Sequence, residues 1–402
     1  MTMSQTQHEH ASDLPRETFQ SSPAHAPSDE SLITDLCVIG RGTCGTIYMS
    51  ASPSTVAYKI GQDRDALWND IRLTSRVHRA LTDSEHTWAI RGSRPRVPAI
   101  KGWIADEAKE GFWAESACFF AESEDRETTP FVFALYLIPT IDLEARQALL
   151  SRYEFTTSKA AVFANPENDF CLVRPYLGLA TRKDEPLCRS DNLWNFPLTR
   201  EDLRSFPFDD DLAMKLAKEM ATGLAIIHWH ANVDGMDIEF VLGGANDWDE
   251  KQVTLANDLE TSEPFCSSPQ NLVLGAPVSK SSFRQNRPFR TACRTRLYVL
   301  DFDKASLLSF DRPEAAIQQL VTAVTCNDPY FPDPTATRDE DKQLWNAFRA
   351  TYLRTAHSVS KGLRQKYGKR ARGWPVWFMD QWERKADELS EGKNGEFIEF
   401  GD

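Results

Sequence analysis

The chain has 402 residues, of which 41% are hydrophobic and 11% aromatic, and this composition predicts a globular protein of one large or two ordinary domains. Its 46 Lys and Arg against 59 Asp and Glu give a formal net charge of −13, which argues against a nucleic-acid partner. The eight cysteines lack zinc-ligand spacing, and no membrane-spanning run or signal peptide is found, so we expect an intracellular protein, cytoplasmic or nuclear, without a membrane partner.

The first 30 residues are rich in Ser, Pro, His and acidic residues and show no periodicity. This composition predicts a disordered tail over residues 1–30. The three histidines within it fit a flexible polar segment better than a metal site.

A G-x-G-x-x-G pattern follows the tail, at Gly40, Gly42 and Gly45. By itself this pattern is a weak signal. In a dinucleotide-binding fold the third glycine would begin a helix, but β-branched and aromatic residues follow at 46–48, and a turn is predicted at 52–54. The glycines are therefore expected in a β-hairpin.

Three strands are predicted around these glycines, near 36–40, 46–50 and 56–60, and the third carries Lys59. Backbone N–H groups of such a turn can close over nucleotide phosphates, while a lysine on the third strand binds them. The alternative is an ordinary surface hairpin with a solvated lysine.

The segment from 62 to 81 places Leu67, Ile71, Val77 and Leu81 among charged residues, which predicts an amphipathic helix. Asp70 is a carboxylate on this helix, and a solvated helix face would explain it without a specific partner.

Residues 95–100 contain two prolines and predict at best an edge strand. Two apolar runs follow, at 131–139 and 169–178, and each has the length of a buried strand leading into a hinge. The sequence does not show which of the two runs leads into the hinge.

Leu212, Leu216, Met220 and Leu224 recur every four residues, which predicts a helix over 211–230 with its apolar face in the core. His228 and His230 near its end fit packed or capping residues better than metal ligands, because no third ligand is nearby.

A polar segment over about 245–295 is expected to be disordered or regulatory. A short strand at 297–300 then leads into Asp301-Phe302-Asp303. The remainder is predicted to be helical, at 313–325, 338–360 and 375–390. The basic run at 361–372 fits a solvated helix end better than a localisation signal.

Together, the glycine hairpin, strand lysine, amphipathic helices and D-F-D sequence resemble the protein-kinase-like superfamily over roughly residues 33–310. N-F-P-L at 195–198, V-D-G-M-D-I-E-F-V-L at 233–242 and N-D-P-Y-F-P at 327–332 are most similar to an uncharacterised fungal kinase-like family often labelled "zinc finger protein". Similarity to aminoglycoside-phosphotransferase-type kinases is more distant.

This resemblance implies an α+β, two-lobed protein-kinase-like fold with a small antiparallel β N-lobe and a mainly helical C-lobe. The implied parts are a tail at 1–30, an N-lobe-like region with insertions at 31–180, a helical C-lobe at 181–392 with the loop at about 245–295, and a tail at 393–402.

The resemblance also implies ATP and Mg²⁺ as cofactors. Gly40, Gly42 and Gly45 would cover the phosphates, Lys59 would bind them and Asp70 would pair with Lys59. Asp301 would bind Mg²⁺, with Asp303 in place of the D-F-G glycine as a further candidate ligand. Such chemistry depends on positioning and on neutralising oxygen charge.

The departures from the kinase pattern concern the catalytic segment. Phe240 stands where a second metal-binding asparagine belongs, so Asp237 or Glu239 would have to replace that oxygen ligand. The base would be Asp234 or Asp237. No A-P-E and no segment of activation-loop length follow Asp301, which favours a small-molecule substrate over a peptide.

Two functions are therefore expected with equal weight. The first is an ATP-dependent phosphotransferase acting on a small hydroxylated molecule. The second is a pseudokinase that serves as a regulatory or scaffold module, with a protein partner and no phosphoryl transfer. A transcription-associated adaptor would depend on the basic run and the family label alone.

Overall fold

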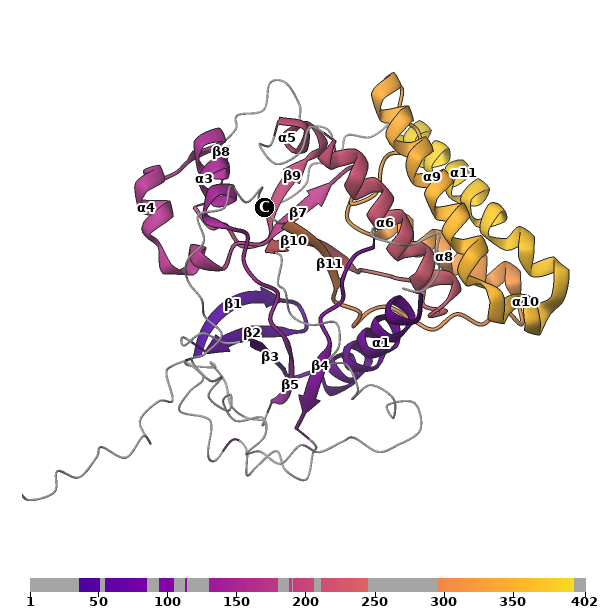
Figure 1. Ribbon diagram of the computed structural model, residues 1–402, viewed down its shortest axis with the longest axis horizontal. Helices are drawn as coiled ribbons and strands as arrows, with labels where there is room; N and C mark the ends of the chain where they lie inside the picture. The colour runs from indigo at the N-terminus through magenta and orange to yellow at the C-terminus, as the bar shows by residue number, and fades with distance from the viewer. Residues whose placement is uncertain are drawn as a thin grey trace, which may run out of the picture. The chain divides into compact units, whose positions relative to one another are not determined.

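The computed structural model describes residues 36–50, 55–84, 94–104, 113, 130–179, 188–189, 191–205, 211–244 and 295–393 (Figure 1). The predicted tail at 1–30, the predicted turn at 52–54, the polar segment up to residue 294 and the C-terminal tail from 394 lie outside these residues. The described part is a mixed α+β structure, which confirms the α+β part of the predicted fold class.

The first sheet has five antiparallel strands in the order β1 (Leu36–Gly42), β2 (Gly45–Ser50), β3 (Val56–Gly61), β5 (Phe131–Tyr136) and β4 (Ile100–Trp103). The predicted glycine hairpin and third strand are confirmed. Gly45 is required by packing, because a Cβ there would lie 2.5 Å from the carbonyl oxygen of Ile60.

Helix α1 (Arg64–Asp83) joins the two hydrophobic regions of the protein. It begins at Asp63, whose side chain accepts a hydrogen bond from the Ala66 N–H at 3.0 Å. Near its start, Leu67 and Ile71 pack against the first sheet. Further along, Val77 belongs to the larger core. The amphipathic helix predicted there is confirmed.

The second sheet has four strands in the order β11 (Thr295–Leu300), β10 (Glu239–Gly244), β7 (Val173–Tyr176) and β9 (Phe196–Thr199). Only the β7–β9 pair within it is parallel. The two competing apolar runs thus enter different sheets, since the first forms β5 and the second contains β7. A short parallel pair joins β6 (Glu154–Phe155) and β8 (Cys188–Arg189).

The chain passes from the first core to the larger core after β5. Leu135 still packs with the first sheet, whereas Ile141 belongs to the larger core. Hydrogen bonds fix this crossing: the Ile141 N–H donates to the Cys171 carbonyl at 3.0 Å, and the Gly244 N–H donates to the Pro139 carbonyl at 2.8 Å.

Residues 95–100, predicted to be at best an edge strand, form only a single bridge before β4 begins. Arg96 forms an isolated parallel bridge with Tyr298 of β11, through backbone hydrogen bonds to Leu297 and Val299. β4 begins only at Ile100. The prolines on either side of Arg96 lack the N–H groups needed to extend this pairing.

Helices make up most of the rest. They are α3 (Leu143–Arg152), α4 (Lys159–Ala164), α5 (Arg200–Ser205), α6 (Leu212–Trp229), α8 (Pro313–Cys326), α9 (Asp339–Val359), α10 (Lys361–Tyr367) and α11 (Trp374–Lys393), with 3₁₀ turns at Pro166–Phe170 and Gly368–Gly373. The predicted helices α6, α8, α9 and α11 are confirmed within three residues at each end. None of the described helices is long and apolar enough to cross a membrane.

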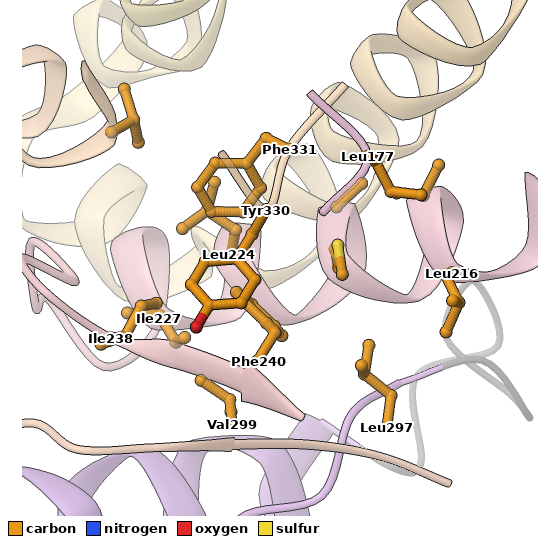
Figure 2. Close-up of a cluster of buried hydrophobic side chains, with 14 of the residues drawn as sticks. Leu177, Leu216, Leu224, Ile227, Ile238, Phe240, Leu297, Val299, Tyr330 and Phe331 are labelled. Carbon is orange, nitrogen blue, oxygen red and sulfur yellow. The ribbon is translucent and has the colours of Figure 1, made fainter. Parts of the chain in front are cut away.

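The larger core lies between α6, the second sheet and α9 (Figure 1). The apolar stripe of α6 is buried, as the four-residue spacing predicted. Phe240 of β10 lies in this core, with its ring centroid 5.7 Å from that of Tyr330 and 5.8 Å from that of Phe331 (Figure 2).

A buried hydrogen-bond network joins the end of α6 to α9. The Trp229 indole N–H donates to the Tyr352 hydroxyl at 2.7 Å. The Tyr352 hydroxyl in turn donates its proton to Nδ1 of His228, also at 2.7 Å. The Nε2–H of His228 then donates to the Asp234 carbonyl at 3.1 Å. Burial lowers the pKa of His228 to about 3, so this histidine stays neutral.

We predict that Tyr352→Phe lowers the free energy of unfolding by about 2–4 kcal/mol, because it leaves buried polar atoms of His228 and Trp229 without a partner. Chemical denaturation measures this change. Tyr367→Phe is the matched control, since its hydroxyl bonds Asp311 in an exposed position and its loss should cost about 0.5 kcal/mol or less. Equal effects of the two changes would contradict the importance of the network.

Candidate functional site

A cavity of about 460 Å³ lies where the glycine turn, β3 and α1 meet the ends of β10 and β11. Its volume is in the range of small-molecule sites. The predicted site residues that line it are Gly40, Gly42, Gly45, Lys59, Asp70, Asp237, Glu239 and Asp301. Asp234 and Asp303 do not line it.

Lys59 lies between two carboxylates in this cavity. Its Nζ is 2.6 Å from Asp70 Oδ2 and 2.7 Å from Asp301 Oδ1, and the residue is only 7% exposed. Burial alone would lower the pKa of Lys59, but the two carboxylates raise it well above its usual value. Burial raises the pKa of Asp301 against the opposing effect of Lys59. We call these three residues the ion triplet.

Asp70 also fixes the backbone that carries Asp301. Its Oδ1 accepts hydrogen bonds from the Phe302 N–H at 3.1 Å and from the Thr74 hydroxyl at 3.0 Å. The helix thus holds both the lysine of β3 and the segment after β11. The structure thus brings Lys59, Asp70 and Asp301 together from β3, the α1 helix that follows it, and the distant end of β11.

Packing within the protein requires glycine at only one of the three predicted glycine positions, Gly45. At Gly40 a Cβ would meet nothing closer than Ile47 at 3.6 Å, and at Gly42 nothing closer than Gly45 at 3.9 Å. The protein's own packing therefore does not require glycine at these two positions, unlike at Gly45. Because both line the cavity, the missing side chains leave space there that a ligand's phosphates could fill.

The structure separates the two candidate bases. Asp234 is buried, and its carboxylate accepts hydrogen bonds from the Ser306 N–H at 2.8 Å and from Gln319 at 2.7 Å. A role of Asp234 as base is therefore disfavoured, because its oxygens hold the chain together away from the cavity. Asp237 lines the cavity, is half-exposed and contacts Lys304 Nζ at 2.6 Å.

A second charged group also lines the cavity. Arg174 of β7 forms ion pairs with Glu239, and with Asp328 at 3.5 Å. Burial raises the pKa of Glu239 to about 7, although Arg174 opposes this shift, and Asp301 raises it further. Glu239 therefore changes charge near neutral pH.

Only some of the predicted metal ligands line the cavity. Asp301 and Glu239 both line the cavity, but Asp303 is buried outside it, near Cys44 of the glycine turn. Among the described residues, no group of three or more His, Cys, Asp or Glu is arranged to hold a metal ion. Two carboxylates still suit Mg²⁺, which is commonly bound through one or two carboxylates together with ligand phosphates.

Lys304, Arg174 and Asn195 line the cavity but were missed in the sequence. In the structure, Asn195, Asp237 and Asp301 adopt a left-handed backbone, with φ of 49°, 58° and 65°. Asn and Asp tolerate this conformation best among non-glycine residues, and it is frequent at functional sites. Lys304 does not adopt this backbone conformation.

Comparison with protein families finds a match to a family described as "Zinc finger protein" over residues 297–363. This match covers β11 from Leu297 on, the Asp301–Lys304 segment, α8, α9 and the start of α10. No curated protein matches the chain.

The proposed resemblance to the protein-kinase-like superfamily, and to its fungal kinase-like family, is therefore corrected. The match is to a zinc finger protein family over 297–363, and no kinase family matches the chain. The short motifs identified residues that line one cavity, but residues shared by one site do not define a family.

We predict that Glu239 makes stability depend on pH. Because its pKa is raised in the folded state, the folded protein binds more protons than the unfolded one between about pH 4.5 and 7. The free energy of unfolding should therefore fall as pH rises through about 7, and Glu239→Gln should remove this component.

Chemical denaturation of both proteins at about pH 5 and about pH 8 measures the difference. Glu154→Gln, at a largely exposed glutamate, is the control and should show no such trend. A difference between wild type and Glu239→Gln that does not change with pH would show that Glu239 has an ordinary pKa.

Proposed function

We propose that the cavity binds ATP with Mg²⁺ and that the protein transfers a phosphoryl group to a small hydroxylated molecule. The observation that supports this most is the ion triplet, in which a buried lysine paired with two carboxylates lines the same cavity as a glycine turn with open space at Gly40 and Gly42. Lysine and backbone N–H groups are the usual partners of nucleotide phosphates.

The charge of the cavity supports a requirement for a divalent cation. Five carboxylates line it against four cationic side chains, among the described residues: Asp70, Asp237, Glu239, Asp301 and Asp328 against Arg41, Lys59, Arg174 and Lys304. When all five carboxylates are ionised, the net charge of about −1 would repel a polyphosphate on its own. Asp301 and Glu239 offer oxygen ligands for Mg²⁺ in the same space.

Bound ATP with Mg²⁺ would supply an activated phosphoryl group. Lys59 would hold phosphate oxygens, and the N–H groups of the 40–45 turn would cover them. Asp237 would accept the proton of the substrate hydroxyl, because it lines the cavity and is half-exposed, whereas Asp234 is occupied elsewhere.

We further propose that the first sheet with α1 and the larger core form two lobes on either side of the cavity. The two hydrophobic clusters, and the change between them at 135–141, support this arrangement. The segment 137–141 would then serve as the hinge, with Leu137 and Ile138 on the cavity wall.

The second candidate is a nucleotide-binding regulatory module that does not transfer phosphate. It is favoured by Phe240, which stands where a second metal-binding asparagine was expected and is fully buried against Tyr330 and Phe331. A phenylalanine cannot coordinate Mg²⁺.

We predict that ATP with MgCl₂ stabilises the wild type by about 2.7 kcal/mol at 100 times the dissociation constant, because ligand binds only the folded state. Lys59→Met and Asp301→Ala should lose this gain, each measured against its own ligand-free protein by thermal denaturation. Lys159→Met, at a surface lysine paired with Glu154, is the control and should keep the gain.

Stabilisation by ATP without Mg²⁺, or no stabilisation of the wild type, would contradict the proposed site. ADP formation with a library of small alcohols and sugars then separates the two candidates. A phosphotransferase should lose turnover by roughly a hundredfold in Asp237→Asn while it still binds nucleotide. A regulatory module should form no ADP in either protein.

A further inference from the structure

Lys304 is a cavity residue outside the ion triplet. It lines the cavity directly after Asp303, its side chain is half-exposed, and its Nζ lies 2.6 Å from Asp237 Oδ2. Asp237 and, more weakly, Asp303 raise the pKa of Lys304, so this lysine is charged at neutral pH. An ammonium group has three N–H donors, and Asp237 takes one of them.

The backbone on both sides of Lys304 is fixed by α1. Asn69 Nδ2 donates to the carbonyls of Asp303 and Ala305, each at 2.8 Å. The orientation of this amide is determined by Arg72, which donates to Asn69 Oδ1 at 3.1 Å. Lys304 therefore extends toward the cavity from a backbone that is held at its two neighbours.

Asp237 is fixed in the same way from the other side. Its N–H donates to the side-chain oxygen of Asn327 at 2.6 Å, and the Asn327 amide donates to the Gly235 carbonyl at 2.9 Å. The Lys304–Asp237 pair thus joins two fixed segments, and only the side chains are free to exchange partners.

The ion triplet cannot neutralise a polyphosphate by itself. Lys59 carries one positive charge between two carboxylates, so the triplet has a net charge of about −1 if both are ionised. A ligand with several anionic oxygens therefore needs further positive charge, which Mg²⁺ and a second cation of the protein would supply together. Lys304 has the charge, the exposure and the fixed backbone that this task requires.

We propose that Lys304 is a second ligand-binding cation of this cavity. When the nucleotide binds, its ammonium group releases the Asp237 carboxylate and contacts an anionic phosphate oxygen instead. This inference rests on the proposed nucleotide function and adds a binding residue to it. Because Asp237 competes with the phosphate for Lys304, the two residues should affect nucleotide affinity in opposite directions.

The test is calorimetric titration of ATP with MgCl₂ into the full chain and its variants. Lys304→Met should weaken binding by about tenfold or more, and Lys304→Arg should restore most of the loss. Asp237→Asn should bind as tightly as the wild type or more tightly. Lys366→Met, at a surface lysine paired with Asp311, should leave affinity unchanged.

The outcomes are distinguishable. No binding by the wild type overturns the proposed function, and the role of Lys304 with it. Binding by the wild type and equal binding by Lys304→Met overturns the role of Lys304 alone. Weaker binding in both Lys304→Met and Asp237→Asn would show that Lys304 acts only by holding Asp237, which also contradicts the proposal.

Discussion

The buried ion pairs of Lys59 with Asp70 and Asp301 are the constraint on which the described structure depends. A buried lysine is tolerated only where carboxylates compensate its charge, and removal of one member of a buried pair commonly costs about 3–5 kcal/mol. The three side chains come from β3, α1 and the end of β11. Their pairing therefore requires the first sheet, the helix and the second sheet to meet at one place, which is where the cavity lies.

Hydrogen bonds of Asp234 also hold together the segments that carry residues of the cavity. Its carboxylate accepts hydrogen bonds from Met236, Ser306 and Gln319, and its carbonyl accepts one from His228. It thus links the segment that carries Asp237 to the segment that carries Lys304, and both to α6. A carboxylate in a polar loop after a helix is here a structural residue, and the exposed Asp237 three residues later is the one that faces the cavity.

The sequence predicted helices and strands better than the side-chain contacts between them. The glycine hairpin, α1, α6 and α9 follow from local patterns, because β-branched residues favour strands and a four-residue apolar period favours a buried helix face. Neither the choice between Asp234 and Asp237 nor the burial of Asp303 could be predicted, since both depend on residues such as Ser306, Gln319 and Cys44 that lie far away in the chain or lack a pattern. The family resemblance was wrong because it was drawn from motifs whose residues suit phosphate binding in general.

The central claim is that the cavity between the glycine turn and Lys59 holds a nucleotide with its metal ion. A crystal structure of the full chain with MgCl₂ and a non-hydrolysable ATP analogue tests it most directly. The account predicts phosphate oxygens within hydrogen-bond distance of Lys59 Nζ and of the 40–45 turn, with a metal ion bound to Asp301. A nucleotide bound elsewhere, or crystals without nucleotide at concentrations that saturate ordinary ATP sites, would contradict it.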